Sequence, residues 1–115
     1  MATFDTVRKA AAHLPGVEVS ESGWGRAIKV NGKMIACEAS NKSAEPKSLV
    51  VRIDIDQREA LIAEAPAVYY VTEHYVKYPS VVVRLPRVKP AALKDLLQAA
   101  ARFVAASGKR KSKRT

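Results

Sequence analysis

The sequence predicts a two-layer α+β domain, in which an antiparallel sheet is packed by helices on one face. Short runs of β-branched residues alternate in polarity, which is typical of strands with one buried face. Asn31-Gly32 lies between two such runs and is a strong hairpin signal, because both turn positions need a positive φ. Segments with helical spacing separate the runs, and tight hairpins beside separate helices favour an antiparallel α+β sandwich.

Helix ends are indicated by local chemistry. Thr3 is a suitable N-cap for a first helix that reaches Leu14, and Pro15-Gly16 ends it. Asp56 is expected to open a second helix, which stops near Ala65. A third helix is expected from Pro90 to the Ser107-Gly108 pair.

The strands are expected at residues 17–21, 26–30, 33–38, 48–55, 68–71 and 80–88. A two-residue turn at Asn31-Gly32 would place Ile28 opposite Ile35. The expected inward side chains of this hairpin are Ile28, Val30, Ile35 and Cys37, and the outward ones are Ala27, Lys29, Met34 and Ala36.

Length and composition indicate one domain and a reducing setting. The 115 residues suffice for a single core. The one cysteine excludes an intrachain disulfide, and no signal peptide or membrane-spanning run is visible. We therefore expect a cytoplasmic protein with no membrane contact, and a monomer is favoured.

The net charge of +9 is unevenly distributed. Residues 1–106 form the expected domain, and residues 107–115 are expected to be a disordered basic tail. Without the tail, fifteen basic residues oppose eleven acidic ones, so about half of the excess charge belongs to the tail. The tail's basic residues are Lys109, Arg110, Lys111, Lys113 and Arg114.

A nucleic-acid site is one interpretation of the basic residues. Lys29, Arg52 and Arg84 fall on the outward faces of predicted strands, and Arg87 follows. Together with the tail they would hold phosphates without reading base sequence. The alternative is an ordinary solvated sheet face. Few aromatic residues are expected on that face, which argues against single-strand recognition.

A ligand pocket is a second interpretation, based on aromatic residues. The candidates are Trp24, Tyr70, His74, Tyr75 and Tyr78. Such a cluster suits a partly wet concave site for a small ligand or a protein partner. The alternative is a loop held by aromatic packing.

Catalytic and metal-binding machinery is not visible in the sequence. Cys37 lies on an expected apolar strand face, where a thiol is usually a small core residue. His13, His74 and Cys37 lack metal-ligand spacing, and Asp56 is better explained as a helix cap than as a cation ligand. We expect no cofactor, no metal and no enzyme activity.

Several motifs follow one another along the chain between Phe4 and Ala105: Leu14-Pro15-Gly16-Val17-Glu18, Trp24-Gly25, Lys29-Val30-Asn31-Gly32-Lys33-Met34, Leu49-Val50-Val51-Arg52, Tyr70, Thr72, His74-Tyr75, Tyr78-Pro79 and Val83-Arg84-Leu85. In this order they resemble the MmcQ/YjbR family of small bacterial proteins. The chain departs from the family pattern at Ala27, Glu73 and Ala101, where an aromatic residue, a proline and a tryptophan are common.

The resemblance implies a fold similar to bacterial frataxin, the CyaY-like or double-wing arrangement, and a role in DNA binding. Frataxin-type iron binding uses an acidic first helix, but here Asp5 is accompanied by Arg8 and Lys9, so iron is disfavoured. The preferred interpretation is weak, non-specific DNA binding by the basic sheet face and tail. The alternative is a small-ligand or protein-interaction domain at the aromatic cluster.

Overall fold

The computed structural model describes residues 3–22, 25–39, 44–45, 47–73 and 75–114, without the side chains of Ser22, Gly25 and residues 107–114. The strands are β1 (Val17–Ser22), β2 (Gly25–Val30), β3 (Lys33–Glu38), β4 (Ser48–Arg52), β5 (Tyr69–Tyr70) and β6 (Ser80–Arg84). The helices are α1 (Phe4–Ala11), α2 (Ile55–Glu64) and α3 (Pro90–Arg114), with a 3₁₀ turn, η1 (Leu85–Arg87).

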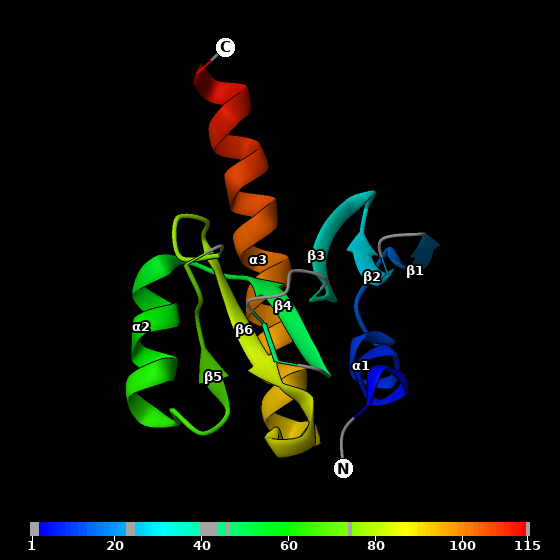
Figure 1. Cartoon of the computed structure of the whole chain (residues 1–115). Coiled ribbons are helices and arrows are strands. Elements are labelled where there is room, and N and C mark those ends of the chain that lie inside the picture. Colours follow the sequence, from blue (N-terminus) through cyan, green and yellow to red (C-terminus); the bar gives the residue numbers. More distant parts are fainter. Residues whose placement is uncertain (1–2, 23–24, 40–43, 46, 74, 115) are drawn as a thin grey trace.

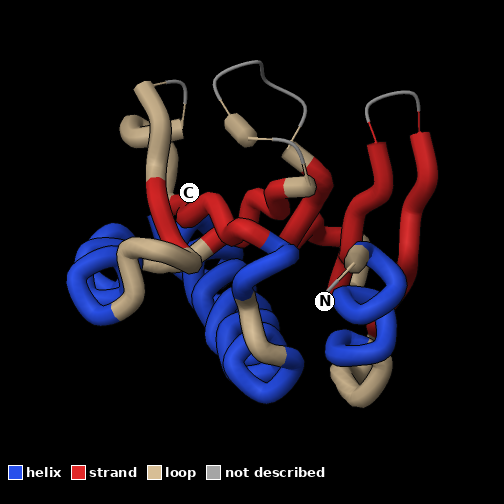
Figure 2. Tube along the Cα trace, turned by 60° about the horizontal axis from the view of Figure 1, so that its bottom comes forward, coloured by secondary structure: helices blue, strands red, loops and turns tan. Residues whose placement is uncertain are grey.

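The strands form one six-stranded antiparallel sheet in the order β1-β2-β3-β4-β6-β5. The helices lie on one side of the sheet, which makes two layers (Figures 1 and 2). Helix α3 crosses behind β3 and β4, α1 packs beside it, and α2 contacts β5 and β6. This arrangement confirms the predicted α+β fold class.

Helix α1 begins where the sequence indicates. The backbone carbonyl of Thr3 accepts from the amide of Val7 at 3.1 Å, and the Thr6 hydroxyl accepts from the amide of Thr3 at 3.1 Å. Phe4, Val7 and Ala11 are buried and form the inner face of the helix. The regular helix ends at Ala11, three residues before the predicted end, and a turn then leads to β1.

The β2–β3 hairpin has the predicted turn but a different register beyond it. Val30 pairs with Lys33, as expected, and Asn31 has a φ of 52°. The register then shifts at Ile28, which pairs with Ala36 instead of Ile35. Because the irregularity adds a residue to β3, Ile35 and Ala36 are both fully buried.

The predicted facing of β3 is therefore wrong after Ile35. Ala36 lies inward, and Cys37 pairs with Ala27 and Val50 on the opposite face. A one-residue shift moves every following side chain to the other face of a strand. No glycine or proline in this segment signals the shift.

Strands β4 and β6 form the centre of the sheet, and they are buried on both faces. Leu49, Val51, Val81 and Val83 are fully buried under the helices. On the other face Val50 pairs with Val82, and their exposures are only 7% and 0%. The prediction of one open face is therefore wrong for the centre of the sheet.

Two boundaries differ from the sequence prediction near β4 and β6. Strand β4 ends at Arg52 instead of Ile55, and the cap of α2 is Asp54 instead of Asp56. The Asp54 carboxylate accepts from the amide of Asp56 at 3.0 Å. Strand β6 ends at Arg84, because Pro86 turns the chain into η1.

Helix α3 continues beyond its predicted end. It runs through Ser107-Gly108 to Arg114, so the helix does not stop at this pair as predicted. The disorder expected of residues 107–115 stays a prediction. One glycine costs a helix only about 1 kcal/mol, and the lysines and arginines that follow are good helix formers. Figure 1 shows the end of α3 extending well beyond the sheet.

None of the helices in the described parts of the chain combines the length and the apolar character needed to cross a membrane.

Candidate functional site

Lys29 and Arg52 lie close together at one end of the sheet face that the helices leave uncovered. Arg52 Nη1 donates to the carbonyl of Met34 at 3.4 Å, and Met34 is the strand partner of Lys29. Within the described residues neither cation has an acidic side chain within ion-pair distance. Glu18 is the neighbour of Lys29 on β1, so this part of the surface carries mixed charge.

Arg84 lies at the opposite end of the β4–β6 pair, and its guanidinium is engaged in contacts within the protein. Its guanidinium forms an ion pair with Glu45 at 2.7 Å and donates to the carbonyl of Pro66 at 3.1 Å. It also stacks 4.1 Å from the ring centre of Tyr70. The hydrogen bond that Arg84 donates to the Glu45 carboxylate raises the pKa of Arg84, and the guanidinium thus serves to stabilise the fold.

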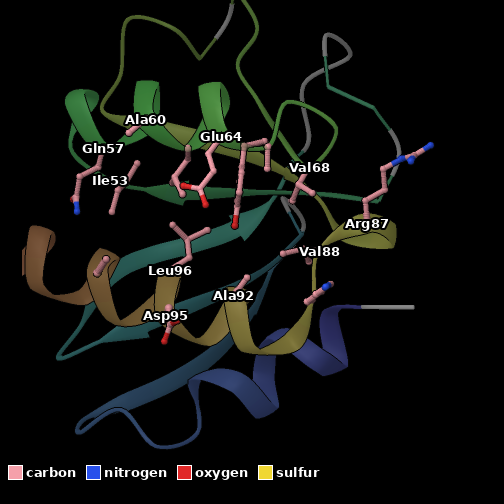
Figure 3. A pocket seen from close by; sticks show the side chains of 15 residues that line it. Ile53, Gln57, Ala60, Glu64, Val68, Arg87, Val88, Ala92, Asp95 and Leu96 are labelled. Atoms are coloured by element: carbon pink, nitrogen blue, oxygen red, sulfur yellow. The ribbon is translucent and has the colours of Figure 1, made fainter.

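The remaining predicted basic residues do not join that face. Arg87 is exposed on η1, on the helix-covered side, and its side chain points outward (Figure 3). The side chains of Lys109, Arg110, Lys111, Lys113 and Arg114 lie outside the described residues. The predicted basic set is thus divided among the two ends of the sheet, η1 and the end of α3.

The Arg84–Glu45 pair predicts a pH dependence of stability. The guanidinium of Arg84 lowers the pKa of Glu45 below its usual value. A lowered carboxyl pKa stabilises the fold above the unfolded-state value, and this contribution disappears as the pH falls through the folded-state value. We expect Glu45→Gln to lower the melting temperature by a few degrees at most at pH 7. The difference from the unmodified chain should vanish near the acid end of a pH series, and a constant difference would contradict this origin.

The predicted aromatic cluster is also divided. The hydroxyl of Tyr70 lies 2.8 Å from the Ser48 hydroxyl and accepts from the amide of Glu45 at 2.8 Å, at the Arg84 end of the sheet. Tyr75 and Tyr78 belong to turns just before β6, at the other end, and Tyr78 is half exposed. Trp24 and His74 lie outside the described residues.

Arg58 was not singled out by the sequence, yet it holds the segment that carries Tyr75 and Tyr78. It lies on α2 and is 4% exposed. Its Nη1 donates to the carbonyls of Val76 at 3.0 Å, Tyr78 at 3.1 Å and Ser80 at 3.4 Å, and its Nε donates to Glu59 at 3.0 Å. An arginine on a weakly amphipathic helix gives no sequence signal of such a role.

Cys37 and His13 have ordinary structural surroundings. Burial and then the nearby Glu38 raise the pKa of the Cys37 thiol, which keeps it protonated and weakly nucleophilic at neutral pH. The His13 ring hydrogen-bonds to Gln98 at 2.9 Å. Among the described residues no group of three or more histidine, cysteine or acidic side chains is placed to hold a metal ion.

A groove of about 630 Å³ lies between α2 and α3, beside the start of β5 (Figure 3). None of the predicted site residues except Arg87 lines it. Its walls are mostly apolar and include Ile53, Leu61, Val68, Val88 and Leu96. The groove has the size of a small-molecule site, and the sequence analysis missed it because its walls come from distant segments.

Comparison with known proteins identifies the family. The model of the YjbR family matches residues 12–101, which is most of the chain. The chain belongs to the YjbR family. The earlier resemblance is thereby confirmed. YjbR-family relatives include uncharacterised proteins of Mycobacterium tuberculosis (Rv2570) and Mycobacterium bovis (Mb2600), each 30% identical over 112 residues, covering 84% of this chain and 84% of the relative.

A solved YjbR-type structure has the same fold. The crystal structure of Deinococcus radiodurans protein DR2400, assigned to family-model domain DUF419, aligns with a TM-score of 0.74 and 23% identity. The alignment covers 94% of this chain and 82% of DR2400. The matched residues 12–101 of the YjbR model stop before the basic end of α3, which is therefore a feature outside the family match.

Proposed function

We propose that this YjbR-family protein binds nucleic acid weakly and without sequence preference, through the basic end of α3 assisted by Lys29 and Arg52. The observation that carries the proposal is the concentration of charge. Residues 109–114 contain five basic residues and no acid, on a helix that extends beyond the body of the domain (Figure 1). Lysine and arginine bind phosphates by releasing condensed counterions.

The direction of α3 brings its basic end to the same end of the molecule as Lys29 and Arg52, although these two residues lie on the other face of the sheet. The helix starts after η1, beyond the Arg84 end of β6, and runs toward the other end of the sheet (Figure 1). At that end Arg52 pairs with Ser80, the first residue of β6. Lys29 and Arg52 therefore lie toward the same end of the molecule as the basic extension, whereas Arg84 lies at the other.

A salt-dependent DNA titration tests the proposal. Fluorescence anisotropy with a labelled duplex would compare the full chain, a chain ending at Ser107, and the variant Lys29→Ala with Arg52→Ala. Each phosphate contact contributes about −0.9 to the slope of log affinity against log salt concentration. We expect a slope of about −4 to −6 for the full chain and a fall of about 4 after truncation.

The matched control for the charge change is Arg8→Ala with Lys9→Ala on α1, where both cations already contact Asp5. This variant removes two positive charges elsewhere on the surface and should leave the slope nearly unchanged. Affinity for DNA that does not change with salt would refute the proposal. Equal binding by the truncated chain would exclude the α3 extension as the contact surface.

A protein-interaction surface before β6 is a second candidate function. Val76 and Tyr78 are 46% and 50% exposed, while Arg58 fixes the backbone that carries them. Exposed apolar side chains on a fixed loop are typical of partner contacts. In this case His74→Ala or Tyr78→Ser should abolish a function that truncation at Ser107 leaves intact.

A further inference from the structure

The groove between α2 and α3 contains a polar group that the fold itself does not use. Tyr69 lines the groove, and only 6% of the residue is exposed. Its hydroxyl forms no hydrogen bond with the described residues, yet the hydroxyl oxygen is not fully enclosed by them. The hydroxyl therefore opens into the groove, where a ligand atom can reach it.

Four charged residues line the groove: the acidic Glu64 and Asp95, and the basic Arg87 and Lys89. The side chain of Glu64 reaches from α2 into the space between the helices, while Arg87 points away from it (Figure 3). Asp95 lines the α3 wall. Within the described part of the chain neither Glu64 nor Asp95 forms an ion pair.

The carboxylates of Glu64 and Asp95 both influence the Tyr69 hydroxyl. Its pKa is raised, first by burial and then by the negative charges of Glu64 and Asp95. These two side chains come from different helices, so a cation bound beside the Tyr69 hydroxyl is attracted by the negative charge of both carboxylates. The surrounding walls are apolar, with Leu61 and Leu96 on opposite sides.

From this geometry we propose that the groove binds a small molecule with an apolar body and a protonated amine. The apolar part lies along the walls, and the ammonium group lies between Glu64 and Asp95 with the Tyr69 hydroxyl as an acceptor. An ammonium group donates three hydrogen bonds, and carboxylates that have no ion-pair partner among the described residues favour a cation over a neutral or negative group. The inference is independent of the nucleic-acid proposal, because the groove does not include the α3 extension.

Three probes of equal chain length test the groove: decylamine, decanol and decanoate. Isothermal titration calorimetry would give their affinities, and amide chemical-shift changes would locate the bound probe. The net charge of +9 attracts decanoate and repels decylamine at long range. A preference for decylamine would therefore report the local charges of the groove. We expect decylamine to bind at least tenfold more tightly than decanol, and decanoate to bind most weakly.

Isosteric variants separate charge from shape. Glu64→Gln with Asp95→Asn should reduce the affinity for decylamine to that for decanol and leave decanol binding unchanged. Tyr69→Phe should weaken decylamine binding about threefold to tenfold. Ala92→Trp should fill the groove and abolish binding of all three probes, with Ala91→Trp, exposed on the same helix, as the matched control.

Ala60→Trp blocks the groove from the α2 side and covers the case in which Ala92→Trp fails to fold. Shift changes that lie outside the α2–α3 groove would overturn the proposal. So would equal affinity for the three probes, a preference for decanoate, or binding that persists in both tryptophan variants. Loss of DNA binding by the truncated chain with intact decylamine binding would separate this site from the nucleic-acid surface.

Discussion

Arg58→Met is expected to lower the free energy of unfolding by about 2–4 kcal/mol. Methionine fills much of the same volume but donates no hydrogen bond. The carbonyls of Val76, Tyr78 and Ser80 would then lose the guanidinium that they share. Because the arginine is only 4% exposed, water cannot readily replace it. Urea unfolding monitored by circular dichroism measures the change.

Glu59→Gln is the control for the Arg58 prediction. Glu59 forms an ion pair with Arg58 but its side chain is 62% exposed, so its loss should cost less than about 1 kcal/mol. The Arg58 effect thus depends on the backbone carbonyls and not on the ion pair. Similar losses from both variants would contradict this assignment.

Leu97→Ala is expected to destabilise the fold by about 3–4 kcal/mol. Leu97 is fully buried on the face of α3 that packs against the sheet and α1. Its truncation leaves a closed cavity, because the surrounding elements relax only in part. Guanidinium unfolding at constant pH gives the difference from the unmodified chain.

Leu96→Ala, one residue earlier, should cost only about 1–2 kcal/mol. Leu96 lines the α2–α3 groove and is 5% exposed, so its truncation widens an existing groove instead of creating a closed void. The pair compares the same substitution on two sides of one helix. Equal losses would mean that the groove is as tightly packed as the core.

The parts of the fold that follow from local chemistry were predictable. Thr3 is the N-cap of α1, Asn31-Gly32 forms the hairpin turn, and Pro90 begins α3. Each of these residues acts through its own backbone or through its nearest neighbours in the sequence. The register shift after Ile28 was not predictable. It depends on how Ile35 and Ala36 both fit under α3, which is a packing property of distant segments.

The candidate site was predictable to a smaller extent. Alternation along the strands correctly separated Arg52 from the core, but no local pattern could show that Glu45, 39 residues away, neutralises Arg84. The walls of the α2–α3 groove come from two segments that are distant in the sequence, residues 53–69 and 87–99, so they share no sequence motif. The role of Arg58 could not be predicted either, because it depends on backbone carbonyls that only the folded structure brings around the guanidinium.

The order of the sheet leaves β1 and β5 as its edges, and this affects how copies of the chain meet in solution. Unpaired edge strands invite pairing with other chains. Strand β5 has only two residues, too few for a stable ladder, and β1 carries Glu18 and Glu21 in an otherwise basic protein. Two β1 strands brought together would place carboxylates near one another, so the acidic edge opposes self-assembly of the sheet into larger aggregates.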